Sequence, residues 1–378
     1  MRIACDARAL LGPLTGVGTW TLEIMGGLAA SPGLEVVLAA PRPVELPPSR
    51  RGHAMSTLPT PPFRLPGTLW LHTLLPAALA AARAEVFVAS LAIAPRRSPV
   101  PVVTMVHDLT PRTHPHRHTL ANRFCFNAYL EESLELSAAV VTGSSATAIE
   151  LEATFPWLAG RLVRIGYGVD GFFTPAPEGD DGRSVREQHA GGRRYLLHLG
   201  TLEPRTGLEP LVAAWEALCE SLADPPALVV AGAPGWRTGP ILARLRRSPR
   251  AQHLHLPGYV SRAEVRDLMR HAEVFVLASE AEGYGLPLAE AICCGAPAVA
   301  ADLPVLRETA GDAAVYADAA DPAALAAAIA RALDPAVAAD LRRRTAARAA
   351  KLSWAPAVAA WAELLERVAR EGGRGGRG

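Results

Sequence analysis

Short apolar segments alternate with longer stretches rich in alanine and leucine along nearly the whole chain. The apolar segments are bounded by glycine, proline or aspartate, as buried strands are. The stretches between them are long enough for helices, so a helix would follow each strand before the next strand begins. This order predicts the α/β class with parallel sheets.

The expected strands fall into two sets, one on each side of a polar, glycine-rich segment at residues 175–192. In the first half they lie at residues 2–5, 35–39, 86–89, 102–106, 139–142 and 162–165. In the second half they lie at residues 195–199, 227–231, 253–256, 274–277, 298–300 and 314–316. No fixed sequence period relates the two sets, so we expect two related domains rather than a solenoid.

The chain has 378 residues, and one domain typically has ~150. We expect a first domain over residues 1–175 and a second over residues 176–352. Residues 353–371 are amphipathic and follow the second sheet, which predicts a helix that packs back on the first domain. The tail, residues 372–378, is rich in glycine and arginine and is expected to be disordered.

Charge and hydropathy exclude several classes of protein. The chain has 38 basic and 37 acidic residues, a net charge of +1, so no basic surplus favours nucleic acid. The longest apolar stretch, residues 74–94, is interrupted by Pro76, Arg83 and Glu85 before the ~20 residues that a membrane span requires. The start leads directly into a strand without a signal sequence, so we expect a cytoplasmic protein. Residues 69–75 could contact a membrane weakly at its inner face, but core packing is the expectation.

Residue types that support cofactor chemistry are scarce. The five cysteines lack C-x-x-C spacing, which favours reduced thiols over a zinc site or disulfides. Lys351 is the only lysine and lies far from the motifs below, so a Schiff-base mechanism is not expected. His114, His116 and His118 alternate around Pro115, which favours a loop rather than a metal site. We therefore expect no metal and no cofactor.

Residues 279–294, SEAEGYGLPLAEAICC, are the most informative segment. An apolar strand leads into a glycine-rich turn and then into a helix with Pro287 in its first turn. The amides of such a helix start point outward at the carboxyl end of a strand, where α/β sheets bind phosphorylated ligands. Glu282 and Glu290 frame this turn, and a carboxylate suits the diols of a sugar or ribose.

This segment resembles the E-x7-E motif of retaining glycosyltransferases of the GT-B fold, family 4. Further segments agree with that family in chain order. These are residues 2–20 and 102–115, similar to its first-domain loops, residues 161–175, similar to the segment closing the first domain, and residues 195–215, similar to its donor-phosphate segment. The resemblance spans nearly the whole chain and implies two Rossmann-like domains with parallel sheets that face each other across a cleft.

The resemblance implies roles for residues of the second domain. Glu282 would contact hydroxyls of the transferred sugar, and Glu290 would hold the nucleotide ribose. The nucleotide base would pack near Tyr259 and Val260. The backbone amides that would lie over the sugar and the diphosphate belong to Gly283, Tyr284, Gly285 and Leu286.

The phosphate clamp departs from the family pattern. The family usually has E-P-R-K there, whereas this chain has Glu203, Pro204, Arg205 and Thr206. The resemblance leaves Arg205 to supply charge to the diphosphate. Thr206 takes the place of a lysine, for which Thr201, His198 and Arg112 are candidate replacements.

The first domain carries further candidates. His107 and Asp108 end an apolar strand; the resemblance implies that the histidine approaches the donor sugar, and a capping His-Asp pair is the alternative. Gly16 and Gly18 lie in TGVGTW, which the resemblance makes a flexible loop near the diphosphate or acceptor, and a plain turn before a helix is the alternative. Asp6 and Arg8, together with Asp108, are candidate acceptor contacts.

The resemblance implies transfer of a hexosyl group, with retention, from a nucleoside-diphosphate sugar to a glycan, lipid-linked or small-molecule acceptor. GDP-mannose is favoured as donor because the H-D-L-T-P and G-T-L-E-P-R segments resemble bacterial mannosyltransferases. Two alternatives stay open: a GT-B epimerase of nucleotide sugars, and a non-catalytic partner that binds them. The sequence does not indicate the oligomeric state or the acceptor.

Overall fold

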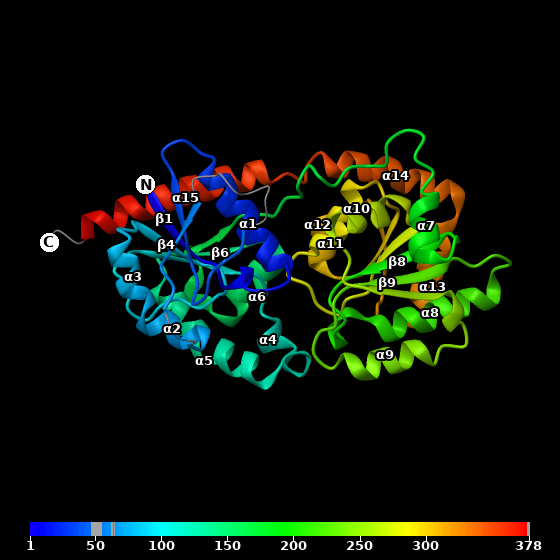
Figure 1. Cartoon of the computed structure of the whole chain (residues 1–378), viewed down its shortest axis with the longest axis horizontal. Helices are drawn as coiled ribbons and strands as arrows, with labels where there is room; N and C mark the ends of the chain where they lie inside the picture. Colours follow the sequence, from blue (N-terminus) through cyan, green and yellow to red (C-terminus); the bar gives the residue numbers. More distant parts are fainter. Residues whose placement is uncertain (47–54, 62, 64, 376–378) are drawn as a thin grey trace. The chain divides into compact units, whose positions relative to one another are not determined.

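A computed structural model describes residues 1–46, 55–61, 63 and 65–375. The chain forms two compact units (Figure 1). Unit 1 comprises residues 1–168 and 354–378, and unit 2 comprises residues 169–353. The last three residues of the expected disordered tail, 376–378, lie outside the described residues.

Unit 1 is built on one parallel sheet of seven strands. The strand order is β3-β2-β1-β4-β5-β6-β7, so the order reverses between β1 and β4 as it does in Rossmann-like sheets. The strands are β1 (Arg2–Asp6), β2 (Glu35–Ala39), β3 (Met55–Thr57), β4 (Val86–Ala89), β5 (Val102–Val106), β6 (Ala139–Thr142) and β7 (Leu162–Arg164).

Strand β3 is the one that the apolar pattern does not predict. It has three residues, two of them exposed, and it pairs only with β2 at the edge of the sheet. An edge strand needs no continuous apolar run, because it has one neighbour and can be short. The other strands of unit 1 lie within a residue of their expected bounds.

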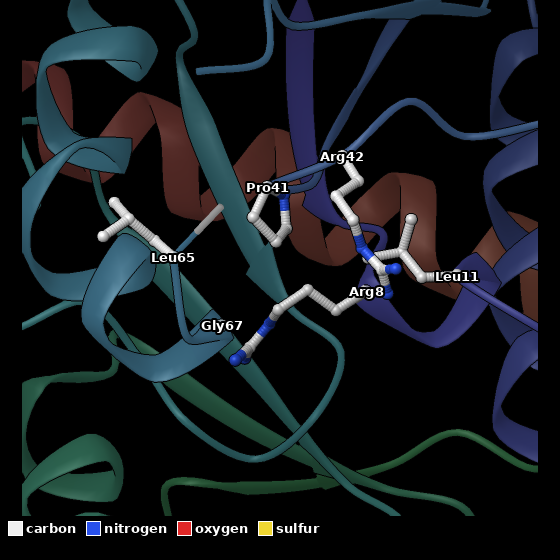
Figure 2. Close-up of a pocket in the computed structure, with 6 residues that line it drawn as sticks. All are labelled: Arg8, Leu11, Pro41, Arg42, Leu65 and Gly67. Carbon is white, nitrogen blue, oxygen red and sulfur yellow. The ribbon is translucent and has the colours of Figure 1, made fainter. Parts of the chain in front are cut away.

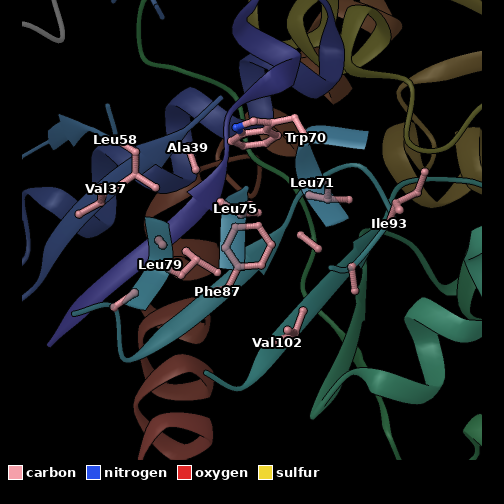
Figure 3. Close-up of a cluster of buried hydrophobic side chains, with 14 residues drawn as sticks. Val37, Ala39, Leu58, Trp70, Leu71, Leu75, Leu79, Phe87, Ile93 and Val102 are labelled. Atoms are coloured by element: carbon pink, nitrogen blue, oxygen red, sulfur yellow. The ribbon is translucent and has the colours of Figure 1, made fainter. Parts of the chain in front are cut away.

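Helices cover the sheet of unit 1 and bury its apolar residues. Figure 3 shows Phe87 of β4 and Val102 of β5 in one apolar cluster with Trp70 and Leu71, which lie on a helix that precedes β4. The expected core packing of residues 69–75 therefore holds for Trp70, Leu71 and Leu75, while Leu69 and Leu74 are exposed. The helices are α1 (Gly16–Ala29), α2 (Gly67–Thr73), α3 (Leu75–Ala81), α4 (Thr110–Thr113), α5 (Leu120–Leu136), α6 (Ser145–Thr154) and α15 (Trp354–Gly375).

The final helix, α15, packs beside α1 within unit 1 (Figure 1). A Cβ atom at Gly27 of α1 would lie 2.4 Å from a methyl group of Val358, so the two helices approach closely. The rings of Trp20 and Trp361 also meet edge to face, 5.4 Å apart. The helix continues to Gly375, further than the expected residue 371.

Unit 2 repeats the same plan with six parallel strands. Their order is β10-β9-β8-β11-β12-β13, and it reverses between β8 and β11. The strands are β8 (Tyr195–Leu199), β9 (Ala227–Ala231), β10 (Leu254–Gly258), β11 (Val274–Leu277), β12 (Ala298–Ala301) and β13 (Ala314–Ala317). The helices are α7 (Arg183–Ala190), α8 (Leu208–Ser221), α9 (Thr238–Arg246), α10 (Arg262–His271), α11 (Leu286–Cys293), α12 (Pro304–Ala310), α13 (Pro322–Leu333) and α14 (Pro335–Ala349).

Unit 2 begins at residue 169, before the expected boundary at residue 175. The intervening segment is held by arginines of α10: Arg262 pairs with Asp170 at 2.7 Å, and Arg270 donates to the hydroxyl of Thr174 at 2.7 Å. These contacts attach the segment to helix α10 of unit 2. Within the described residues, no helix combines the length and hydropathy that crossing a membrane requires.

Candidate active site

The reversal of strand order in unit 2 brings two turns together. Open α/β sheets bind ligands beyond the carboxyl ends of the strands where the order reverses. In unit 2 these strands are the paired neighbours β8 and β11, so the turn after residue 199 lies beside the turn after residue 277. The predicted phosphate clamp and the predicted E-x7-E turn are these two turns.

Close backbone contact joins the two turns. Pro204–Thr206 form a single 3₁₀ turn, and Gly207 follows with a φ of 67°. A Cβ atom at Gly207 would lie 1.8 Å from the carbonyl oxygen of Ala278, so only glycine fits at this position. The amide of Glu280 donates to the carbonyl oxygen of Arg205 at 3.0 Å, which fixes the clamp against the second turn.

Arg205 lies between two carboxylates. Its Nε donates to Glu203 at 3.1 Å, and its Nη1 is 3.7 Å from Oε1 of Glu282. The side chains of Arg205, Glu203 and Glu282 are 30%, 22% and 17% exposed, so the group is partly open to solvent. The fold therefore brings the predicted diphosphate cation beside the glutamate predicted to contact the sugar.

Thr206 supports the turn instead of offering a free hydroxyl. Its side chain is buried, and its Oγ1 donates to the carbonyl oxygen of Glu203 at 2.8 Å. This hydroxyl stabilises the 3₁₀ turn that carries Arg205. Thr201 is half-buried earlier in the same segment, and its methyl group packs against Gly235.

The second turn is shaped by Gly285, one of its two predicted glycines. Gly285 has a φ of 83°, and a Cβ atom there would lie 2.4 Å from a methyl group of Leu306. Leu286 then starts helix α11 with Pro287 in its first turn. The carbonyl oxygen of Tyr284 accepts from Thr309 at 2.6 Å, and burial raises the pKa of the Tyr284 phenol to about 12.

The remaining predicted donor contacts of unit 2 lie on separate elements. Glu290 lies on α11, eight positions after Glu282, and is partly exposed. Tyr259 and Val260 follow β10 at the edge of the sheet, and the Tyr259 side chain is 63% exposed while Val260 is buried. An exposed aromatic ring of this kind offers a surface on which a flat base can stack.

His198 lies inside β8, just before the clamp. Its ring is buried, Nδ1 donates to the carbonyl oxygen of Val276 at 3.1 Å, and Nε2 has no hydrogen-bond partner among the described residues. Burial lowers the pKa of His198 to about 4, although the bond to Val276 acts in the opposite direction. The imidazole is therefore neutral at pH 7.

The free energy of unfolding should fall when the pH is lowered, in part because of His198. The folded-state pKa of about 4 is below the ordinary 6.5, so the stabilisation is complete above pH 6.5 and is lost as the pH falls toward 4. Between pH 7 and pH 5 this group should account for about 2 kcal/mol. Chemical denaturation at both pH values would show this difference in wild type and a smaller one in His198→Gln. If the free energy of unfolding changes equally with pH in both proteins, His198 is not the cause of this pH dependence.

The strand order of unit 1 reverses between β1 and β4. Asp6, Ser90 and His107 lie close together there, at the carboxyl ends of β1, β4 and β5. The hydroxyl of Ser90 donates to the carbonyl oxygen of Asp6 at 2.6 Å, and Nε2 of His107 donates to the carbonyl oxygen of Ser90 at 2.9 Å. Nδ1 of His107 is then the acceptor for the hydroxyl of Tyr167. Both ring nitrogens are engaged within unit 1.

Enclosure of the His107 ring determines its charge. Trp20 meets it edge to face at 5.2 Å, and burial lowers the pKa of His107 to about 4 despite the Ser90 bond and nearby Asp108. His107 is therefore neutral at pH 7 and suits positioning better than proton donation. A Cβ atom at Gly143 would lie 2.3 Å from the ring of Tyr167, so this glycine lets Tyr167 reach the histidine.

The other candidates of unit 1 have clear local roles. Oδ1 of Asp108 accepts from the amide and the hydroxyl of Thr110. Gly16 and Gly18 lie in the first turn of α1, so the structure has a helix where the resemblance implied a flexible loop. A Cβ atom at Gly18 would lie 2.9 Å from the carbonyl oxygen of Ala9, which explains the glycine by packing.

Three participants were not predicted as site residues: Glu203, Ser90 and Tyr167. Glu203 belongs to the quoted E-P-R-T segment, so its place in that motif is a signal for its contact with Arg205. Ser90 and Tyr167 carry no local signal, because their contacts with His107 cross the sheet. Among the described residues, no group of three or more histidine, cysteine, aspartate or glutamate side chains could hold a metal ion.

Comparisons with known proteins agree with this architecture. Residues 14–171 match the family Glycosyltransferase Family 4, and residues 183–352 match the family Glycosyl transferases group 1. A similar relative is the O-antigen chain mannosyltransferase B of Escherichia coli, 29% identical over 231 residues. The match covers 61% of this chain and 61% of that relative, so it spans about three fifths of the relative's length.

Solved structures show the same fold at low sequence identity. Sucrose-phosphate synthase from Thermosynechococcus elongatus has a TM-score of 0.79 at 20% identity, with 97% of this chain and 99% of that chain covered. Anabaena HepE in complex with UDP and glucose has a TM-score of 0.77 at 18% identity, with the same two coverages. With its two Rossmann-like units and the two family matches, this chain belongs to the GT-B glycosyltransferases of family 4.

Proposed function

We propose that this glycosyltransferase moves a hexosyl group from a nucleoside-diphosphate sugar to a glycan, lipid-linked or small-molecule acceptor, with retention of configuration. The observation that carries the proposal is the approach of Arg205 to Glu282 at the carboxyl ends of β8 and β11. A guanidinium group there suits a diphosphate, and a carboxylate beside it suits sugar hydroxyls.

The proposed donor contacts combine this pair with the roles that the family motifs imply. Arg205 would stabilise the negative charge that grows on the leaving diphosphate as the glycosidic bond breaks. The backbone of Gly283 to Leu286 would lie over the sugar and the diphosphate, Glu290 would hold the ribose, and Tyr259 would stack on the base. Thr201 and Thr206 would support the clamp.

The chemistry requires no nucleophile from the protein. The donor's leaving phosphate would itself take the proton of the acceptor hydroxyl on the same face of the sugar, which accounts for retention. His107 would position the sugar as a neutral ring, since its pKa of about 4 means that the imidazolium form needed for acid catalysis is not populated at pH 7. Asp6, Arg8 and Asp108 are the proposed acceptor contacts.

Mannose from GDP-mannose is the proposed donor. Mannose as the transferred sugar is supported by the E. coli relative, which is named a mannosyltransferase. HepE was solved with UDP, so binding of guanine and uracil nucleotides should be compared directly. We place the reaction in the cytoplasm, where nucleotide sugars are available, with weak contact to the membrane if the acceptor is lipid-linked.

Transfer should not depend on a metal ion. Arg205 and the helix start of α11 would supply the charge stabilisation that a cation supplies in other phosphate sites. After treatment with EDTA, the initial rate measured by release of nucleoside diphosphate should stay within about twofold of the untreated rate. Loss of activity that Mg²⁺ or Mn²⁺ restores would contradict this expectation.

A thermal-shift screen with GDP, UDP, ADP and their sugars tests the donor side. A ligand at about 100 times its dissociation constant should stabilise the protein by ~2.7 kcal/mol, which raises the unfolding temperature measurably. We expect the largest shift with GDP and GDP-mannose. No shift with any nucleotide would contradict the proposal. Donor epimerised without transfer would favour the epimerase alternative, and binding without turnover over a broad acceptor panel would favour the non-catalytic one.

A further inference from the structure

A pocket of about 360 Å³ opens in unit 1 at the carboxyl ends of β1 and β2. Figure 2 shows the six residues that line it: Arg8, Leu11, Pro41, Arg42, Leu65 and Gly67. Two of the six are arginines, and three are apolar. Of these six residues, only Arg8 is a candidate acceptor contact from the sequence.

Arg8 is held in place by a buried partner. Its Nε lies 3.0 Å from Oδ1 and its Nη2 lies 2.7 Å from Oδ2 of Asp6, whose side chain has no exposed surface. A Cβ atom at Gly67 would lie 3.3 Å from Nη1 of Arg8, so the guanidinium group extends over Gly67, as Figure 2 shows. Asp6 balances the charge of Arg8 and leaves Nη1 on the pocket side.

Arg42 has no such partner. Its side chain is exposed, and among the described residues it makes no hydrogen bond or ion pair. Glu45 is the nearest acidic residue in the sequence and is not paired with it. The charge of Arg8 is therefore neutralised by Asp6, whereas the charge of Arg42 is not. Together these groups give the pocket a net charge of about +1.

The walls of the pocket are apolar. Leu11 and Leu65 are partly buried, and Pro41 is buried. A small polar ligand alone would leave these walls uncovered, and an apolar ligand alone would offer no hydrogen-bond acceptor to Arg42 or to Nη1 of Arg8. The ligand that satisfies both is an oxyanion attached to a sugar ring or another group with an apolar face.

We propose that this pocket binds an anionic group of the acceptor, a phosphate ester or a carboxylate, through Arg42 and Nη1 of Arg8. The inference rests on the proposed function, since it takes the ligand of this unit to be the acceptor. It assigns Arg42 as a specificity residue and predicts that anionic acceptors are used in preference to neutral ones.

Binding of matched sugars tests the proposal. Isothermal titration at low salt would compare mannose 6-phosphate, mannuronic acid and mannose, with saturating GDP present so that the donor site is filled. Wild type should bind an anionic sugar at least about tenfold more tightly than mannose. Arg42→Gln should remove most of that difference, and Arg42→Lys should keep a part of it, because lysine retains charge without the bidentate geometry.

Arg246→Gln is the matched control, because Arg246 is an exposed arginine of unit 2. It should bind all three sugars as wild type does. Equal affinity for anionic and neutral sugars in wild type, or an anion preference that survives in Arg42→Gln, would overturn the proposal. If wild type prefers mannose 6-phosphate but not mannuronic acid over mannose, the anionic group of the acceptor is a phosphate ester.

The same titrations separate this inference from the proposed function. If GDP and UDP both fail to bind wild type, the donor assignment itself is wrong. If a nucleotide binds normally and the anion preference is absent, only the acceptor inference fails. Increasing salt should weaken binding of the anionic sugars and leave mannose unchanged.

Discussion

Replacing Arg205 with alanine should lower kcat by about 10²–10³-fold, the loss typical when a group that stabilises transition-state charge is removed. The reason is its position: Arg205 is the cation of the clamp and lies 3.7 Å from Glu282. Charge on the diphosphate grows as the bond to the sugar breaks, so the effect should fall mainly on kcat rather than on KM. Steady-state assays with one donor and one acceptor measure both.

Two variants serve as controls for Arg205→Ala. Arg205→Lys keeps the charge and should recover part of the lost rate, which a merely structural role would not explain. Arg246→Gln removes an exposed arginine far along the chain from the clamp and should retain the wild-type rate. An unchanged kcat in Arg205→Ala would remove this residue from the site.

Glu290→Ala should raise the dissociation constant of the free nucleoside diphosphate by about 10–100-fold, as expected for the loss of hydrogen bonds to a charged group. Glu290 lies on the rigid helix α11 and is assigned to the ribose, which does not change during the reaction. Removal of its carboxylate should therefore weaken the binding of the donor and of the free nucleotide to a similar extent. The value of kcat at saturating donor should change much less. Isothermal titration with the nucleotide measures this directly.

Glu282→Ala is the informative comparison, because Glu282 is assigned to the moving sugar. It should lower kcat while the free nucleotide still binds with nearly the wild-type affinity. Glu209→Ala, an exposed glutamate on α8, should change neither quantity. Equal nucleotide affinity in Glu290→Ala and wild type would contradict the ribose assignment.

Most of the fold could be predicted because buried parallel strands are continuous apolar runs. Strands such as β5 and β9 are buried along their whole length, and their bounds match the expected residues. Strand β3 could not be predicted, since a short edge strand needs no apolar pattern. Unit 1 ends at residue 168, earlier than the expected residue 175, and contacts of Asp170 and Thr174 with α10 help to attach the following segment to unit 2.

The candidate site was predictable as two motifs but not as one arrangement. Nothing local in the sequence places Arg205 beside Glu282; the reversal of strand order between β8 and β11 does so. The structural role of Thr206 also required the fold, because its hydroxyl bonds to the backbone of its own turn. The neutral state of His107 results from burial, and the rings of Trp20 and Tyr167 that contact it are distant in sequence.

Proton NMR of the wild-type protein incubated with GDP-mannose and an acceptor tests the proposed transfer most directly. We expect a new anomeric signal of an α-mannoside attached to the acceptor, which is the configuration of the donor, with GDP appearing in equal amount. A β-mannoside would contradict retention. Donor that stays intact, or is hydrolysed or epimerised without any signal from a mannosylated acceptor over a broad acceptor panel and with UDP-sugars as well, would contradict the proposed transfer.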